Sequence, residues 1–334
     1  MTEHPWRKHL RIDPVPALLS SGNEAVIYFT RRDLCDESVG SPEHVRELPG
    51  VRKILKTQLP DGSWPPAGKK PEVYPPYHYH LVETFRHFRT LVERYCFNKE
   101  HPSAASAAEF IFSCQTADGD IRGMIGNQYA TYYTGAMLKL LINAGYEEDP
   151  RVEKGMRWLL DMRQDDGGWI VPLAAHSIDR ETMIRLTSEY AEPIGPDRSM
   201  PFSHNWTNMV LQAFAAHSLY RKSPEAVSAG NLLKSRFFKP DVYTSYQDPG
   251  YWVRFVHWWP NLLMALDSLS LMGFPKDDPD IAGGLDWFVA NQQDDGLWNA
   301  SYKKGDKFSG TAKEIKERLW VSLAVCRVLR RCYE

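Results

Sequence analysis

Hydrophobic residues recur along most of this chain with the periodicity of helices, and no stretch of any length alternates hydrophobic and polar residues as a strand does. This pattern predicts an outer series of helices at residues 43–58, 102–115, 150–164, 224–237 and 279–292. An inner series is predicted to alternate with it at residues 79–95, 127–144, 203–220, 251–272 and 311–332. The residues before position 40 predict one more, shorter pair.

One sequence pattern recurs where the outer helices end. An apolar helical end is followed by glutamine, an acidic-glycine turn and usually tryptophan, at residues 53–64, 109–121, 157–169 and 286–298. We call these four segments the glutamine turns. Glycine adopts the left-handed backbone conformation that ends a helix, and aspartate can bond neighbouring amides. The recurrence indicates a repeat protein, and we expect the glutamine and tryptophan to tie one repeat to the next.

The starts of the outer helices also repeat. Asp149, Ser223 and Asp278 are predicted N-caps, each followed by a proline at the first helical position. Each interval between these prolines holds two helices, so the repeat unit is a helical hairpin. Because residues 311–332 are apolar on a broad stripe, we expect about six hairpins to close into a double ring, whereas an open solenoid needs polar ends. The predicted fold class is all-α, an α/α toroid in a single domain spanning residues 1–334.

Residues 171–202 interrupt the spacing of the repeats. They lie between the third glutamine turn and its inner helix, where the other repeats use fewer residues. Residues 183–190 predict a short helix within this insert. Long inserts in compact domains are often lids or binding loops. We expect this insert to be a lid over the mouth of the ring.

The pattern of helix, glutamine, acidic spacer and Gly-x-Trp resembles the QW repeat of squalene–hopene and oxidosqualene cyclases. The resemblance covers residues 43–330, and residues 164–169 and 293–298 are the nearest matches. The β subunits of protein prenyltransferases share the same toroid. The resemblance implies the fold, whereas the reaction has to be argued from catalytic residues.

The catalytic motifs of these families are not present intact. The DxDD motif, whose aspartate protonates an alkene in the cyclases, does not occur; residues 277–280 come nearest and are explained by helix capping. The prenyltransferases hold zinc with an aspartate, a cysteine and a histidine. His204 and Asp248 occupy comparable places, but no cysteine accompanies Asp248. We therefore expect no metal and no cofactor.

Aromatic residues gather at the predicted starts of four inner helices, within residues 74–80, 126–135, 203–208 and 248–261. Such a lining offers apolar walls and π faces that stabilise cations, as carbocation chemistry on an isoprenoid requires. Core packing between helices would also explain these aromatic residues. The candidate substrate-binding residues are His80, Tyr129, Tyr132, Trp206, Tyr251, Trp252, Arg254, Trp258 and Trp259.

Candidate catalytic residues are fewer. Asp248 could act as an acid, although Asp-Pro-Gly before a helix is also an ordinary cap. His204 and His257 would suit acid–base chemistry if they face one cavity, whereas a buried histidine usually satisfies a neighbour. Isoprenoid chemistry predicts a deep, mostly apolar pocket with at least one acid of raised pKa.

These features predict a terpene cyclase-like or prenyltransferase-like protein that handles an isoprenoid. A toroid that holds a lipid or a protein without catalysis explains the missing motifs better. A carbohydrate-active enzyme would need two carboxylates across an open groove, and Glu83, Asp248 and Glu317 show no evident pairing.

Composition narrows the expected partners. The 334 residues are 43% hydrophobic and 25% charged with a net charge of −2, which gives no electrostatic reason to bind nucleic acid. No segment approaches a membrane-spanning run, which leaves only peripheral membrane contact open. The N-terminus lacks the apolar core of a signal peptide and the five cysteines form no CxxC pair, so we expect a cytoplasmic protein. The expected partner is an apolar small molecule; the sequence does not define an oligomer.

Overall fold

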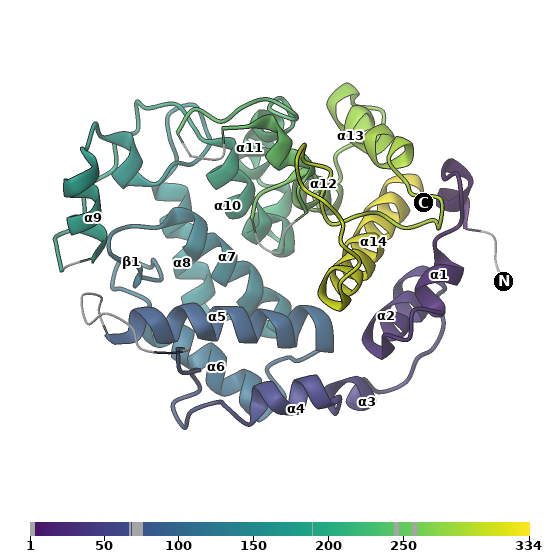
Figure 1. Cartoon of the computed structure of the whole chain (residues 1–334). Coiled ribbons are helices and arrows are strands. Elements are labelled where there is room, and N and C mark those ends of the chain that lie inside the picture. The colour runs from purple at the N-terminus through teal and green to yellow at the C-terminus, as the bar shows by residue number, and fades with distance from the viewer. Residues whose placement is uncertain (1–3, 67, 69–75, 189, 244–246, 256–258) are drawn as a thin grey trace. The chain divides into compact units, whose positions relative to one another are not determined.

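The computed structural model describes residues 4–66, 68, 76–188, 190–243, 247–255 and 259–334. In these ranges the regular structure is helical apart from one short strand, β1 (Met124–Asn127) (Figure 1). The predicted all-α class is confirmed. The chain forms two compact units: unit 1 consists of Met1–Val45 and Gly230–Glu334, and unit 2 of Arg46–Ala229. The boundaries fall within α3 (Glu43–Arg46) and α11 (Pro224–Lys234).

Unit 2 contains two layers of helices. The inner layer consists of α5 (Pro76–Tyr95), α7 (Thr131–Leu141) and α10 (His204–Ala216), and α7 packs against both of the others. The outer layer consists of α4 (Pro49–Leu55), α6 (Pro102–Ser113) and α8 (Pro150–Asp161). Helices α4 and α6 pack against α5, and α8 packs against α7 and α10.

Unit 1 has the same layered arrangement. Its inner helices are α2 (Glu24–Leu34), α12 (Leu262–Leu271) and α14 (Ala312–Tyr333), and α14 packs against both of the others. The short α1 (Val15–Leu19) covers α2, and α13 (Pro279–Ala290) covers α12. The first and last hairpins therefore belong to one unit. Each unit has the inner and outer helical layers of the predicted α/α toroid, and the closed ring itself stays a prediction.

The glutamine turns share one hydrogen-bonding geometry. Their glycines have positive φ, and the side chain four residues earlier donates to the glycine carbonyl oxygen at 2.8 to 3.1 Å. The donors are Gln58, Gln115, Arg163 and Gln292. The sequence pattern predicts Gln164 and Gln293 as the repeat glutamines of the last two turns. This register was wrong because those residues lie one position later, where the backbone N–H completes the turn.

Three of these side chains also bind the segment that follows in the outer layer of the same unit. Gln58 donates to the carbonyl oxygen of Ser103 at 2.8 Å, and Gln115 donates to that of Arg151 at 2.8 Å. Gln292 donates to the carbonyl oxygen of Ile12 at 2.7 Å. The expectation that these glutamines tie neighbouring repeats is confirmed.

The tryptophan of each turn joins its outer helix to the next inner helix. The indole N–H of Trp64, Trp169 and Trp298 donates to the carbonyl oxygen ten residues earlier, at 2.7 to 2.9 Å. The backbone N–H of each donates to a hydroxyl on the inner helix. These hydroxyls belong to Thr84, Thr207 and Ser322; Ile121 uses Thr134 in the same way.

Several predicted boundaries are confirmed and others are corrected. The side chains of Asp149, Ser223 and Asp278 accept hydrogen bonds from the first turns of their helices, as predicted. The inner helix predicted at 251–272 begins only at Leu262, because Pro260 cannot continue a helix and Asn261 caps the new start. Residues 249–253 form a separate 3₁₀ helix, η5 (Pro249–Val253).

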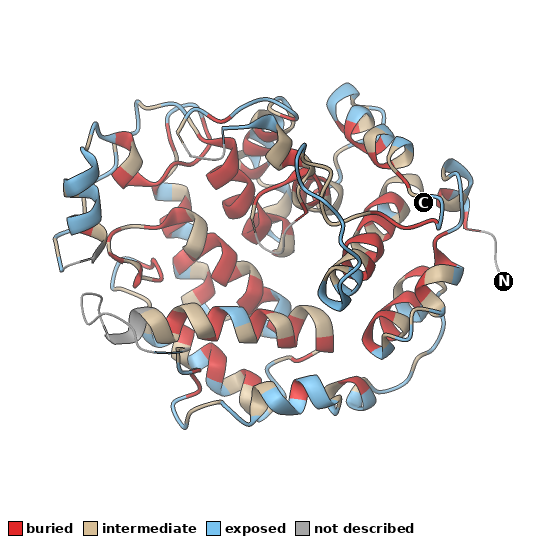
Figure 2. Cartoon of the chain, viewed as in Figure 1, coloured by how far each residue is buried: buried red, intermediate tan, exposed pale blue. Residues whose placement is uncertain are grey.

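Helix α10 lies at the centre of the core of unit 2. Every residue from His204 to Ala215 is buried, as the continuous red of this helix in Figure 2 shows. At Gly135 of α7, a Cβ atom would lie 2.7 Å from the Cα of Val210. Only glycine therefore permits this close approach of α7 and α10.

Candidate functional site

Five candidate residues lie at the starts of the inner helices of unit 2: His80, Tyr129, Tyr132, His204 and Trp206. The first residues of α7 and α10 are bonded to one short segment. Thr131 donates to the carbonyl oxygen of Ile170 at 3.1 Å, and Thr207 accepts from the N–H of Trp169 at 2.9 Å. Strand β1, which leads into α7, contacts α5. The structure therefore brings the starts of α7 and α10 together within unit 2.

The tyrosines of this group are half-buried. The rings of Tyr132 and Tyr133 are in contact, with their centroids 4.2 Å apart and their planes tilted by 33°. The guanidinium of Arg122 lies 4.5 Å from the ring centroid of Tyr129, on its π face. That arginine is held by the buried carboxylate of Asp120 at 2.9 and 3.0 Å. One face of Tyr129 is thus already in contact with a cation.

His204 and Trp206 are more deeply buried, with 5% and 8% of their surface exposed. Both belong to the first turn of α10, which Ser203 caps. The structure leaves their proposed roles as predictions.

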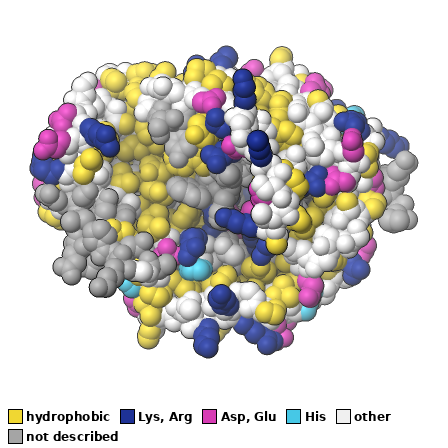
Figure 3. Space-filling model, viewed as in Figure 1, with side chains coloured by type: hydrophobic (Ala, Val, Ile, Leu, Met, Phe, Trp, Pro, Cys, Tyr) yellow, Lys and Arg dark blue, Asp and Glu magenta, His cyan; other side chains and the backbone are white. Residues whose placement is uncertain are grey.

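On the face shown in Figure 3, hydrophobic side chains gather in the region of α7 and α10. The half-buried Tyr132 and Tyr133 belong to the start of α7, and the half-buried Phe202 lies two residues before the start of α10. Aromatic rings with partial exposure at the edge of a packed core are suited to contact with an apolar ligand.

His80 lies beside a short chain of polar groups. Its Nδ1 lies 3.2 Å from the hydroxyl of Ser63, and that hydroxyl lies 2.7 Å from Oδ1 of Asp61. Burial opposes ionisation of Asp61, but the hydrogen bonds from Ser63 outweigh it and hold the pKa of Asp61 below its usual value. The carboxylate is therefore a permanent acceptor near neutral pH.

The remaining described candidates lie in unit 1. Asp248 is exposed, caps η5 by accepting from the N–H of Gly250 at 2.8 Å, and pairs with Lys303. The hydrogen bond from Lys303 is the main reason that the pKa of Asp248 lies below its usual range. A general acid needs the opposite shift. The capping interpretation of Asp248 is confirmed by its geometry, and an acid role finds no support in it.

The aromatic candidates of unit 1 have different surroundings. Trp252 is buried and donates its indole N–H to the carbonyl oxygen of Lys239 at 2.9 Å, as the tryptophans of the glutamine turns do. Tyr251 faces Lys303 at 5.1 Å, and Arg254 pairs with Asp306 at 3.1 Å. Trp259 is half-buried and its carbonyl oxygen accepts from Asn261. His257 and Trp258 lie outside the described residues.

The insert is attached to the start of α7 within unit 2. Its predicted helix is present as α9 (Arg180–Ser188), which packs against β1. The side chain of Gln128 donates to the carbonyl oxygen of Glu192 at 3.2 Å and accepts from the N–H of Ile194 at 3.0 Å. Gln164 donates to the carbonyl oxygens of Asp197 and Met200, both at 2.7 Å. The insert is thus fastened at both a helix start and a glutamine turn.

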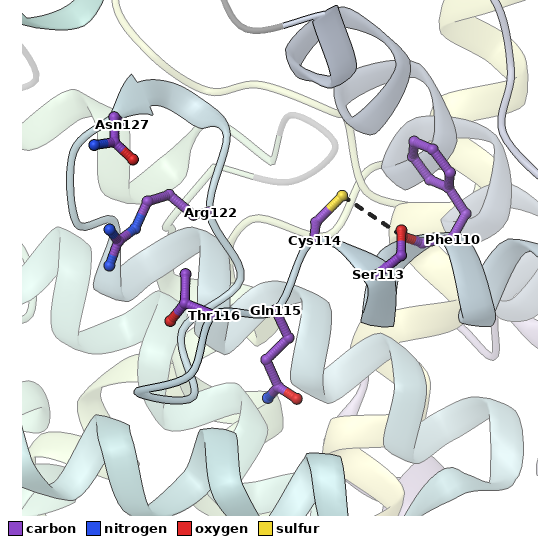
Figure 4. Close-up of a pocket in the computed structure, with 7 residues that line it drawn as sticks. All are labelled: Phe110, Ser113, Cys114, Gln115, Thr116, Arg122 and Asn127. Carbon is purple, nitrogen blue, oxygen red and sulfur yellow. Dashed lines mark hydrogen bonds between the residues drawn. The ribbon is translucent and has the colours of Figure 1, made fainter. Parts of the chain in front are cut away.

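A separate pocket of about 290 Å³ lies between the end of α6 and the loop that carries β1 (Figure 4). Burial raises the pKa of the Cys114 thiol to about 11, so this side chain is a neutral thiol and a poor nucleophile near pH 7. No sequence pattern pointed to this pocket. Its lining residues are Phe110, Ser113, Cys114, Gln115, Thr116, Arg122 and Asn127.

Neither a metal-binding cluster nor a membrane-spanning helix is found among the described residues. Among the described residues, no group of three or more His, Cys, Asp or Glu side chains is arranged to hold a metal ion. Within the same ranges, no helix combines the length and the apolar character needed to cross a bilayer.

Sequence reasoning missed the polar residues that fix the helix starts. Ser63, Thr84, Thr134 and Thr207 were not singled out, although each is buried and hydrogen-bonded to a turn. No fixed spacing marks the threonines in the sequence, because Thr84, Thr134 and Thr207 lie 20, 13 and 38 residues after the turn residues that they bond. Arg122 was also missed, because its contact with Tyr129 depends on the loop around β1.

Comparison with known proteins shows a similarity to one family model over part of the chain. Residues 82–189 match the model of the squalene-hopene cyclase C-terminal domain. This segment runs from α5 to α9 and includes Tyr129 and Tyr132. The resemblance to the terpene cyclase superfamily is confirmed. No curated protein sequence matches the chain significantly.

Several solved structures are similar at low identity. A crystal structure of a protein from Actinoplanes is 15% identical with a TM-score of 0.45, covering 93% of this chain and 90% of its own. A variant of the type II terpene cyclase MstE from Scytonema, in complex with geranylgeranyl dihydroxybenzoate, is 12% identical with a TM-score of 0.46, covering 98% and 87%. Another MstE variant, in complex with merosterolic acid A, is 12% identical with a TM-score of 0.43, covering 95% and 97%. At such TM-scores these likenesses carry no argument about activity.

Proposed function

We propose that this protein handles an isoprenoid, whose apolar chain binds against the aromatic starts of α5, α7 and α10. The observation that carries the proposal is the grouping of half-buried tyrosines with Trp206 at neighbouring helix starts in unit 2. The family match over residues 82–189 supports it, because this match includes the starts of α7 and the loop before it.

The attachment of the insert supports a role as a cover for such a site. Its fastening to Gln128 and Gln164 holds residues 192–200 beside the starts of α7 and α10. Ile184 of α9 and Tyr190 expose 54% and 75% of their surface, so part of the insert presents apolar side chains outward. We propose that it acts as the lid over the bound chain.

A second candidate is a protein that holds the same ligand without converting it. The ionised and exposed Asp248 favours this alternative, because that carboxylate cannot protonate an alkene. In either case the cytoplasmic location and the absence of a cofactor stay predictions.

Mass spectrometry of an organic extract tests the proposal. The natively purified protein is expected to release a stoichiometric isoprenoid, or to take up added geranylgeraniol when it is purified empty. Tyr132→Ala should weaken uptake by about 2- to 10-fold through the lost ring contact. Phe308→Ala, which removes an exposed ring of unit 1, is the matched control and should not.

The same extract distinguishes the two candidates. Recovery of a cyclised or otherwise altered product would identify an enzyme, and recovery of unchanged geranylgeraniol would identify a binder. A protein that neither carries nor takes up an isoprenoid would overturn both.

A further inference from the structure

His80 is the last member of a chain of three polar groups that starts at the first glutamine turn. The Asp61 carboxylate accepts from the Ser63 hydroxyl at 2.7 Å and from the Ser63 backbone N–H at 2.9 Å, both on Oδ1. The same hydroxyl lies 3.2 Å from Nδ1 of His80. Ser63 is fully buried, and His80 is half-buried in the second turn of α5.

The proton positions in this chain follow from the number of donors. A serine hydroxyl has a single hydrogen, and the carboxylate is its stronger and nearer acceptor. Toward His80 the hydroxyl oxygen can therefore only accept, which requires a proton on Nδ1. In the neutral imidazole, Nε2 then carries the free lone pair and is a hydrogen-bond acceptor.

The fourth glutamine turn shows the role of the inner-helix position that His80 occupies at the first turn. In the fourth turn, Arg318 donates to both carboxylate oxygens of Asp295, at 2.5 and 2.6 Å. Arg318 lies four residues before Ser322, as His80 lies four residues before Thr84. Asp295 and Asp61 likewise lie three residues before their tryptophans. The position thus ties the turn aspartate to the inner helix.

The first turn makes this tie with one ring nitrogen only. Arg318 uses two N–H groups and completes the tie directly, whereas His80 reaches Asp61 through Ser63 and uses Nδ1 alone. Among the described residues, Nε2 of His80 makes no hydrogen bond. A nitrogen with a fixed protonation state is therefore left over at the start of an inner helix that contacts β1.

From this geometry, and resting on the function proposed above, we propose that Nε2 of His80 accepts a hydrogen bond from the hydroxyl end of a prenyl alcohol. The aromatic starts of α7 and α10 would hold the hydrocarbon chain, and His80 would select its polar end. A neutral acceptor favours a ligand that donates. An ether has no proton to give, and a diphosphate offers chiefly acceptors. The expected ligand class is a prenyl alcohol.

Equilibrium dialysis with geranylgeraniol and its methyl ether tests this selection. At pH 8, the wild-type protein should prefer the alcohol by about 3- to 10-fold. His80→Phe should bind both compounds equally, because the ring is kept and the acceptor is lost. His87→Phe, an imidazole of the same helix that packs on Trp64, is the matched control and should keep the preference.

The outcomes separate this inference from the proposed function. Equal binding of the two compounds by the wild type, or an unchanged preference in His80→Phe, would overturn the role of His80 and leave isoprenoid binding intact. Failure to bind either compound would instead overturn the proposed function. If His80→Phe does not fold, Ser63→Ala takes its place, and it should reduce the preference toward equality.

Nitrogen-15 NMR of the imidazole rings gives a readout that needs no ligand. In the wild type, Nδ1 of His80 should carry a proton, and Ser63→Ala should lose that bias. A wild-type His80 with its proton on Nε2 would overturn the inference.

Discussion

Ile12 and Gln292 exchange two hydrogen bonds. The N–H of Ile12 donates to Oε1 of Gln292 at 3.1 Å, and Nε2 of Gln292 donates to the carbonyl oxygen of Ile12 at 2.7 Å. The neighbouring Arg11 also donates to the carbonyl oxygen of Gln292 at 3.2 Å. At the last glutamine turn, the N-terminal segment therefore accepts the hydrogen bond that the next outer helix accepts from Gln58 and from Gln115.

Gln292→Ala should destabilise the protein by about 2–3 kcal/mol, because it removes two hydrogen bonds with the backbone of Ile12 and leaves the buried carbonyl oxygen of Gly296 without this partner. Gln293→Ala, one residue later, should cost less than about 1 kcal/mol. Urea unfolding of both variants measures the difference. Equal losses would contradict the register that assigns the repeat position to Gln292.

Thr207→Val tests the tie between a turn and its inner helix. The substitution keeps the shape of the side chain and removes the acceptor of the Trp169 N–H, which is buried. We expect a loss of about 1–3 kcal/mol in the free energy of unfolding. Thr187→Val, whose hydroxyl donates to carbonyl oxygens of its own helix α9, is the control and should change stability little. A neutral Thr207→Val would show that the tie does not contribute.

Glu93 should make part of the stability depend on pH. Burial opposes its ionisation, but Lys139 at 2.8 Å and Arg89 at 3.8 Å outweigh it and lower the pKa of Glu93 to about 2. A depressed carboxylate pKa contributes stability above the unfolded value of 4.5, which is lost as the pH falls toward 2. Because 32% of the side chain is exposed, we expect about 1–3 kcal/mol after allowance for screening.

Unfolding of wild type and Glu93→Gln between pH 6 and pH 2.5 measures this contribution. The wild type should lose about 1–3 kcal/mol more than the variant over that range. Glu100→Gln, which changes an exposed carboxylate, should follow the wild type. Parallel curves for wild type and Glu93→Gln would contradict the role of the Lys139 pair.

Gln128→Ala should loosen the insert without unfolding unit 2. The substitution removes both side-chain bonds to residues 192 and 194, while the contacts of Gln164 with the other end of the insert remain. Hydrogen exchange at the amide of Ile194 should become faster by about 10-fold or more, with core amides of α10 unchanged. Unchanged exchange at Ile194 would show that other contacts hold the insert.

Much of the fold could be predicted because its signals are local. The caps at Asp149, Ser223 and Asp278 and the prolines after them define helix starts within a few residues of sequence. The predicted start of the inner helix at residue 251 was wrong. The apolar, aromatic run from this residue suggested a helix, whereas Pro260 prevents one from continuing through it. The choice between Gln292 and Gln293 depends on which side chain reaches a carbonyl oxygen, and two adjacent glutamines look alike in sequence.

The site was less predictable because its polar contacts join distant segments. Aromatic residues at inner-helix starts were visible in the sequence, including Tyr129 and Tyr132. The contact of Ser63 with His80 joins a turn to a helix that follows a loop, and the cation over Tyr129 comes from the far side of β1. Trp252 was expected to line a cavity. Its indole N–H instead donates to the carbonyl oxygen of Lys239, as the indoles of the repeat tryptophans donate to backbone carbonyl oxygens.

Photo-crosslinking with a diazirine analogue of geranylgeraniol, followed by peptide mass spectrometry, tests most directly whether an isoprenoid chain binds at these helix starts. We predict labelling of peptides that contain Tyr129, Tyr132 and Trp206, with loss of the label when unmodified geranylgeraniol is in excess. Labelling confined to other parts of the chain, or labelling that excess geranylgeraniol does not reduce, would contradict the proposed site.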